Sequence, residues 1–244
     1  MFKRISAFLF DFIMRMMLIA GFALLFSALF GYDAKVEEYE ALSDKYEAEY
    51  GIDLDISAEE FELLPEEVKA KYTAADEAFA KDADAERLSA LILNLTLLIA
   101  IFGILFSYIA LEFAVPLFLK NGQTLGKKIF GIAVMRDDGV RITPAMLFVR
   151  SILGKCTVEA LVPLAIVMLI LLGSAGIIGL IALLLLLGFE VFLMVKTKTN
   201  SCIHDVLSYT VAVDMASQMI FENEEAMIAY KNKIHSEEAD KADY

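Results

Sequence analysis

The chain has 244 residues, of which 59% are hydrophobic, and its mean hydropathy is +0.63. One soluble domain of this length cannot bury so much apolar surface, so much of the chain is expected to face lipid. These values exclude an ordinary soluble domain. They predict an all-α integral membrane protein with several spans.

The first uncharged run, residues 16–32, is slightly short for a helix that crosses about 30 Å of hydrocarbon. The helix is therefore expected to start near Phe12 or earlier, which draws Asp11 and Arg15 into the inner boundary. A basic start followed by an apolar run is also the outline of a signal peptide. The run is longer than a usual signal core, contains two charged residues and ends without an Ala-x-Ala site. We therefore expect a retained first span.

Residues 33–87 carry the charge of the chain: they hold 19 acidic and 6 basic residues, and the whole chain has a formal net charge of −13. Ser57 and Glu60 have the spacing of a capping box, and apolar residues recur at helical intervals after them. We expect two or three short helices that extend the first and second spans. This acidic insert is either a solvated extracytoplasmic segment or a surface that gathers cations or binds a partner.

The remaining spans follow from two further apolar stretches. Residues 88–119 form the second span, which contains Glu112. Residues 156–195 are too long for one crossing and contain a glycine-rich reversal at 173–176, which predicts a hairpin of spans three and four. A single tilted, kinked helix is the alternative. Four spans place these basic residues and both termini inside, as the positive-inside rule requires: Lys3, Arg4, Lys120, Lys127, Lys128, Arg136, Arg141, Arg150, Lys155, Lys196 and Lys198.

The basic cytoplasmic loop, residues 120–155, has its own predicted architecture. Residues 131–136 and 140–143 alternate around an Asp-Gly turn, which predicts a small β-hairpin that residues 209–214 join as a further strand. Thr143 and Pro144 then begin an amphipathic helix that runs to residue 153. Its Arg150, and Lys155 just beyond it, are expected to reach toward headgroups. Lys127 and Lys128 are expected to bind headgroups or to seal the mouth of a polar cavity.

No cofactor is expected. Cys156 and Cys202 both fall near the cytoplasmic face, where a disulfide is not expected, and two cysteines with two histidines give too few ligands for a four-ligand zinc site. A calcium loop starting at Asp53 fails at its sixth and twelfth positions. A phosphate loop at residues 122–127 fails in its spacing and lacks a preceding strand.

Three segments carry a resemblance to a known family. Residues 4–11 read Arg-Ile-Ser-Ala-Phe-Leu-Phe-Asp, residues 121–128 read Asn-Gly-Gln-Thr-Leu-Gly-Lys-Lys, and residues 203–210 read Ile-His-Asp-Val-Leu-Ser-Tyr-Thr. In this order, in a chain with long apolar spans, they resemble the RDD family of membrane proteins. The family is named for one arginine and two aspartates, which map onto Arg4, Asp11 and Asp205. The resemblance implies transport-related relatives, some suggested to exchange sodium for protons. The acidic insert departs from the short form of the family.

Ionisable residues recur at one depth in the spans. These residues are Asp11, Arg15, Glu112, Glu159 and Glu190. At about 1.5 Å per residue, all five lie within roughly 6 to 17 Å of the cytoplasmic charges. Charges at such depth are costly and commonly mark ion or proton pathways, although they also form structural ion-pair networks. Four carboxylates meet one intramembrane arginine, so complete pairing is not expected. Asp205, the family aspartate outside the spans, is added to this set. The candidate ion or proton site therefore comprises Asp11, Arg15, Glu112, Glu159, Glu190 and Asp205.

The pattern as a whole predicts one membrane domain over residues 1–244, with a cytoplasmic tail at 215–244. We expect a small transporter or cation/proton antiporter component in a bacterial inner membrane, with Arg4 and Arg15 as counter-ions. A scaffold or assembly factor that presents the acidic insert outside and the basic loop inside is the alternative. An enzyme is not expected, because no nucleophile, base and orienting group converge. The expected partners are the lipid bilayer and monovalent cations or protons. A homo-oligomer is compatible with the pattern, and nucleic acid is not expected.

Overall fold

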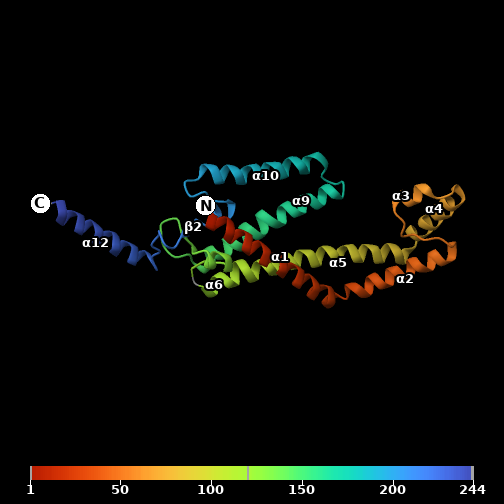
Figure 1. Ribbon diagram of the computed structural model, residues 1–244, viewed down its shortest axis with the longest axis horizontal. Coiled ribbons are helices and arrows are strands. Elements are labelled where there is room, and N and C mark those ends of the chain that lie inside the picture. Colours follow the sequence, from red (N-terminus) through yellow and green to blue (C-terminus); the bar gives the residue numbers. More distant parts are fainter. Residues whose placement is uncertain (1, 120, 243–244) are drawn as a thin grey trace. The chain divides into compact units, whose positions relative to one another are not determined.

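The computed structural model describes residues 2–119 and 121–242, so Lys120 lies outside the described residues. The chain is mostly helical (Figure 1). In the described part, four helices are long and apolar enough to cross a membrane: α1 (Phe2–Phe30), Ala83–Leu119, Pro144–Leu171 and Gly176–Lys196. The predicted class is therefore confirmed.

The contacts divide the chain into two compact units. The first unit joins the start of the chain, up to Ile19, to the residues from Ile104 onward. The second unit is Ala20–Gly103. The first unit contains all the family motif residues, and the second contains the acidic insert.

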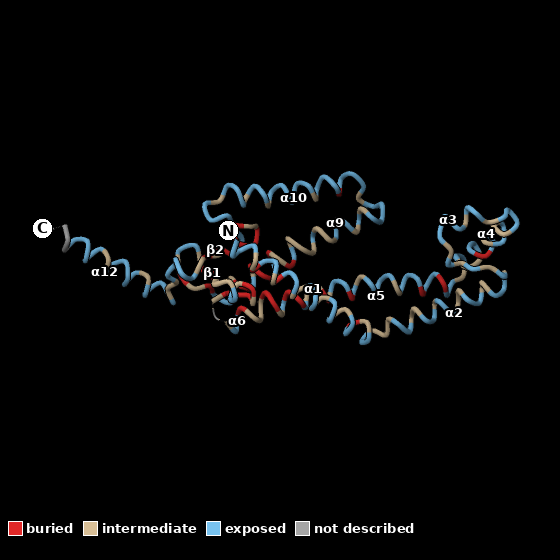
Figure 2. The backbone as a smooth tube through the Cα atoms, viewed as in Figure 1, coloured by how far each residue is buried: buried red, intermediate tan, exposed pale blue. Residues whose placement is uncertain are grey.

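In the first unit, most of the span surface is apolar and exposed. α10 (Gly176–Lys196) is exposed along most of its length, and α9 (Val162–Leu171) alternates between exposed and partly buried residues, whereas buried residues gather around β1 (Ile132–Arg136) and β2 (Thr210–Asp214) (Figure 2). Ile178 is 77% exposed and Leu185 is 69% exposed. Such surface is stable against lipid and unstable against water, which agrees with a membrane-spanning role for these helices.

The predicted reversal between spans three and four is present. Gly173 has φ +71° and Gly176 has φ +47°, in the left-handed region that favours glycine. The two helices then pack closely at Gly179, because a Cβ there would lie 2.8 Å from the Ile170 side chain.

The third span begins earlier than predicted. α8 (Pro144–Phe148), the π-helical η2 (Val149–Leu161) and α9 form one continuous helix, so the separate amphipathic helix and the predicted start at residue 156 were wrong. The helix start predicted at Thr143 and Pro144 is correct: the Thr143 hydroxyl accepts from Met146 N at 3.3 Å, and Pro144 occupies the first turn.

The small sheet confirms one predicted pairing and corrects another. β1 pairs with β2 in antiparallel register, from Ile132↔Asp214 to Arg136↔Thr210, as expected for residues 209–214. The predicted second strand at 140–143 forms only isolated bridges, Met135↔Arg141 and Val140↔Phe221. The chain leaves the sheet there because Ile142 packs with Val134 and Leu147. Thr143 then caps α8.

The second span and several shorter helices lie between and around these elements in sequence. The second span continues from α5 (Ala83–Tyr108) through the π-helical η1 (Ile109–Ala114) into α6 (Val115–Leu119). α7 (Leu125–Ile129) precedes β1, α11 (Ile203–Leu207) precedes β2, and α12 (Glu224–Ala242) follows it.

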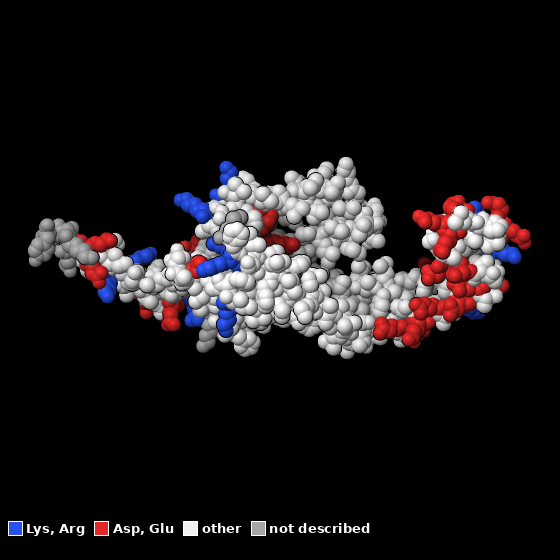
Figure 3. Space-filling view, in the orientation of Figure 1, with Lys and Arg blue, Asp and Glu red and all other residues white. Residues whose placement is uncertain are grey.

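The second unit confirms the predicted helices of the acidic insert. These are α2 (Tyr32–Tyr50), α3 (Ala58–Leu63) and α4 (Glu66–Ala80), and the capping box at Ser57 and Glu60 is complete. Phe79 of α4 packs against Tyr39 and Tyr46 of α2, with both ring centroids at 5.4 Å. Acidic side chains gather over these three helices (Figure 3). The insert therefore has contacts of its own, while its charge is spread over solvated surface.

Replacing residues 35–81 with a short Gly/Ser linker is expected to leave the first unit folded. The ring contacts of the insert join residues within it, and the first unit forms its own compact set of contacts. Detergent-extracted protein should elute as one species with a melting temperature within a few degrees of the full chain. Aggregation of the shortened protein would show that the insert supports the spans.

The membrane orientation also gives a measurable expectation. In a variant without native cysteines, single cysteines at Ala48 and Ser174 should react with an impermeant thiol reagent in intact cells. Cysteines at Ala216 and Ser236 should react only after lysis, because the positive-inside rule places both there on the cytoplasmic side. Labelling at Ser236 in intact cells would contradict this topology.

Candidate functional site

Asp11, on α1, binds the family segment at residues 121–128. Its Oδ1 accepts a hydrogen bond from Gly126 N at 2.8 Å, and its Oδ2 accepts one from the Thr124 hydroxyl. The carboxylate thus lies at the N-terminal end of α7, where backbone N–H groups favour negative charge. A Cβ on Gly126 would lie 2.4 Å from the Ala7 carbonyl oxygen, so the close approach requires glycine. Asp11 is 6% exposed, and this anchoring role accounts for its burial.

Arg4 binds backbone carbonyl groups rather than the family aspartates. Its guanidinium donates to Ala212 O at 2.5 Å and to Thr199 O at 3.4 Å. The expected role of Arg4 as a counter-ion to Asp11 or Asp205 was therefore wrong. The side chain instead ties the start of α1 to β2.

Glu112, in η1, is paired on both carboxylate oxygens. Arg15 Nη2 lies 2.6 Å from Oε1, and Lys155 Nζ lies 2.6 Å from Oε2. Arg15 also donates to the Tyr108 hydroxyl at 3.2 Å and stacks over the Tyr108 ring at 4.5 Å. Arg15 pairs with Glu112 and not with Asp11, four residues before it on α1, because Asp11 binds Thr124 and Gly126. Lys155 neutralises charge inside the cluster instead of reaching toward headgroups.

Arg150 pairs with Asp205, the second family aspartate. Its guanidinium donates to Asp205 Oδ1 and to the Thr210 hydroxyl, and Arg150 is 3% exposed. Thr210 donates in turn to Asp205 Oδ1 at 3.2 Å, and its hydroxyl lies 2.8 Å from that of Ser208. The predicted contact of Arg150 with lipid headgroups was wrong, because a buried partner on α11 holds this side chain inside the fold.

Two glutamates from neighbouring spans meet at the start of α11. Glu159 of η2 accepts from His204 N at 2.8 Å and lies 2.7 Å from His204 Nδ1. Glu190 of α10 accepts from Ile203 N at 3.3 Å. In the described part of the chain, neither carboxylate has a lysine or arginine partner within ion-pair distance.

His204 is held tightly and is neutral. A Cβ on Gly154 would lie 2.6 Å from the His204 Cβ, so this glycine allows α11 to approach η2. Burial first, and then the positive charge of Arg150, lower the pKa of His204 well below its ordinary value. Its contact with Glu159 is therefore a hydrogen bond to a neutral imidazole, which leaves the carboxylate charge without a cationic partner.

One combination of ligand types was not expected from the sequence. Ligand atoms of Glu190, Cys202 and His204 lie within 4.8 Å of one another. Burial, followed by a hydrogen bond to Glu190, raises the pKa of Cys202 to about 12, so this thiol is protonated. Counting only cysteines and histidines missed the group, because its carboxylate comes from α10. The spacing of Cys202 and His204 was the available sequence signal.

The lysines of α7 differ in their surroundings. Lys128 is exposed, whereas Lys127 is half-buried, and burial with the nearby charge of Lys155 lowers the pKa of Lys127 to about 7. Contact of either lysine with headgroups, or a role at a cavity mouth, stays a prediction.

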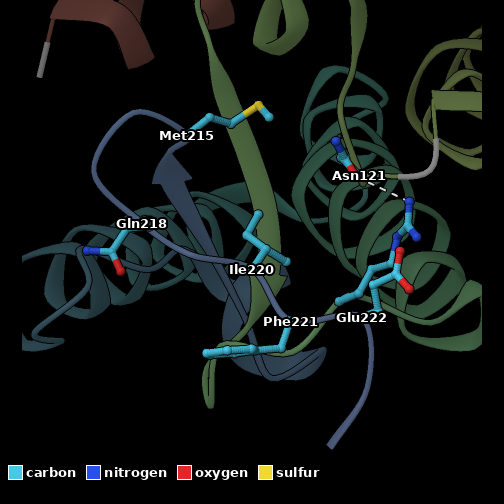
Figure 4. A pocket seen from close by; sticks show the side chains of 7 residues that line it. Asn121, Met215, Gln218, Ile220, Phe221 and Glu222 are labelled. Carbon is cyan, nitrogen blue, oxygen red and sulfur yellow. Dashed lines mark hydrogen bonds between the residues drawn. The ribbon is translucent and has the colours of Figure 1, made fainter. Parts of the chain in front are cut away.

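A pocket of about 280 Å³ lies beside β1 and β2, apart from the charged residues described above (Figure 4). Asn121 Oδ1 there accepts from Arg141 at 3.2 Å, shown by the dashed line. None of the candidate ion-site residues lines it. Its lining is Asn121, Arg141, Met215, Gln218, Ile220, Phe221 and Glu222.

Comparison with known proteins agrees with the motif geometry. No curated protein and no solved structure matches the chain. A model of the RDD family matches residues 1–209, a range that includes Arg4, Asp11, Asp205 and all four spans. The chain belongs to the RDD family of membrane proteins.

Proposed function

We propose that the protein is a small cation/proton transporter, or the ion-binding component of one. Glu159 and Glu190 are its ion-binding carboxylates. The observation that carries the proposal is that these two side chains come from neighbouring spans, meet at α11 and lack a lysine or arginine partner among the described residues. Carboxylates of this kind, at membrane depth, commonly exchange protons and cations.

The other members of the predicted ion site have structural roles in this account. Glu112 is neutralised by Arg15 and Lys155, Asp205 by Arg150, and Asp11 is satisfied by Thr124 and Gly126. Removing the charge of Glu112 or Asp205 leaves a buried cation without its carboxylate. Removing the charge of Glu159 or Glu190 leaves no such cation. The candidate ion site therefore narrows from six residues to two glutamates.

The neutral state of His204 supports proton exchange at Glu159. A protonated imidazole would hold Glu159 as a carboxylate, whereas a neutral imidazole and a backbone N–H leave the carboxylate free to accept a proton. The neighbouring Glu190 then offers a second carboxylate for a cation. A proton and a cation competing for this pair is the simplest exchange mechanism.

Vesicles with an internal pH dye test the proposal. The purified protein should change the internal pH when sodium, potassium or lithium is added outside, and empty vesicles should not. An equal response in both would reject ion transport and would leave the scaffold as the remaining candidate.

The scaffold candidate is favoured by one observation, the acidic surface of α2, α3 and α4 (Figure 3). The basic loop at residues 120–155 offers fewer free charges to a partner than expected. Arg150 pairs with Asp205, and Lys155 pairs with Glu112. In a scaffold, replacement of residues 35–81 abolishes cross-linking to partner proteins in cells. In a transporter, the same variant keeps its ion flux.

A further inference from the structure

We propose that Glu190, Cys202 and His204 form a binding site for a divalent metal ion of the zinc type. Glu190 lies on α10, Cys202 directly precedes α11 and His204 lies in α11, with ligand atoms within 4.8 Å of one another. A thiolate, an imidazole nitrogen and a carboxylate oxygen are a ligand set that Zn²⁺ accepts. The site shares Glu190 with the proposed ion site, but metal binding is measured without ion transport.

The three groups need little movement to bind a metal ion. Ligand atoms of a tetrahedral zinc site lie about 3.5 Å apart, so an inward shift of roughly 1 Å completes the geometry. Glu190 accepts a long hydrogen bond of 3.3 Å from Ile203 N, and Cys202 has extended backbone outside the helix. The Cys202 thiol is also hydrogen-bonded to Glu190, so two of the three ligand groups already lie together.

The imidazole is already oriented. The Glu159 carboxylate lies 2.7 Å from His204 Nδ1, and Gly154 lets the histidine backbone lie against η2. Metal-binding histidines usually have such a carboxylate partner, which fixes the ring. A neutral imidazole keeps a lone pair on one ring nitrogen for a metal ion.

Charge favours a divalent ion here. Binding forms a Zn–S bond at Cys202, and the S–H proton passes to the solvent. The thiolate and the Glu190 carboxylate then balance the two positive charges of the ion. A neutral complex costs far less in a half-buried site than a charged one.

The experiment uses the full-length protein in detergent with Co²⁺ as a spectroscopic probe for zinc. The wild type should show a thiolate-to-cobalt absorption band that one equivalent of Zn²⁺ removes. Cys202→Ser should lose the band, and Cys156→Ser, which changes the other buried thiol, should keep it. Glu190→Gln and His204→Gln should each weaken zinc binding by about tenfold or more.

A second measurement needs no variant. Zinc-edge X-ray absorption of the wild type with one equivalent of Zn²⁺ should show one sulfur ligand at about 2.3 Å. Carboxylates of the acidic insert can bind zinc but supply no sulfur. A shell of oxygen and nitrogen alone, or a cobalt band that survives Cys202→Ser, would overturn the site. Because binding is measured without an ion gradient, its outcome is separate from that of the flux assay.

Discussion

Arg150→Met is expected to destabilise the protein by about 3–5 kcal/mol, because it leaves the Asp205 carboxylate buried without its cation. Arg150 is 3% exposed and Asp205 is 6% exposed, so water cannot replace the lost interaction cheaply. The Thr210 hydroxyl loses the same donor. The measurement is the melting temperature of detergent-purified protein, which should fall by about 6–20 °C unless the variant aggregates.

A double variant and a surface control separate the pair from a general loss of packing. Arg150→Met with Asp205→Asn should be less damaging than the sum of the single changes, since no orphan charge remains. Arg136→Gln removes a surface arginine that pairs with Asp138 and Glu224, and it should cost less than about 1 kcal/mol. Equal losses in Arg150→Met and Arg136→Gln would show that burial of the pair has no special weight.

Gly126→Ala should have the second largest effect, at about 1–3 kcal/mol or more. The added Cβ would lie 2.4 Å from the Ala7 carbonyl oxygen and 2.9 Å from the Asp11 carboxyl carbon. Both neighbours are held in place, so α7 must move away from α1 and the Asp11 hydrogen bond to Gly126 N must lengthen.

Gly188→Ala is the matched control. It lies in α10, where an added Cβ meets nothing within 4 Å. Alanine is the better helix former by about 1 kcal/mol, so this variant should be neutral or slightly more stable. A drop in melting temperature at Gly188 equal to that at Gly126 would contradict the close approach of α7 and α1.

Hydropathy and glycine placement were enough to predict the membrane architecture. The four spans, the reversal at residues 173–176 and the capping box at Ser57 all depend on local sequence, which fixes helix length, left-handed turns and cap geometry. The joining of residues 209–214 to the sheet was predicted from alternation alone. These features need no knowledge of distant partners.

The start of the third span could not be predicted in the same way. Arg150 and Lys155 looked like boundary charges, but Asp205 and Glu112 neutralise them from distant parts of the chain. Hydropathy counts a charge without its partner, so it placed the start of the span too late in the sequence. The expected surplus of carboxylates over cations was overstated for the same reason.

The pairing of the candidate site residues could not be predicted from the sequence. Asp11 and Arg15 stand four residues apart on a helix, which permits a pair, yet the carboxylate faces Thr124 and Gly126. Arg150, Lys155 and Glu159 lie on the π-helical η2, whose turns differ from those of an α-helix. The local sequence did not predict this π-helix. Tertiary contacts therefore decided which carboxylates remain without a cation.

Sodium-driven proton flux in Glu159→Gln and Glu190→Gln tests the central claim most directly. Glutamine keeps the size and hydrogen-bonding shape of each side chain but cannot exchange a proton or balance a cation. Reconstituted at equal protein density, both variants should lose nearly all flux while keeping the wild-type melting temperature within a few degrees. Asp214→Asn, which changes an exposed carboxylate paired with Lys3, should keep flux at the wild-type level. Wild-type flux in both glutamine variants, together with a clear fall in their melting temperatures, would assign the two glutamates to folding and contradict ion transport at this site.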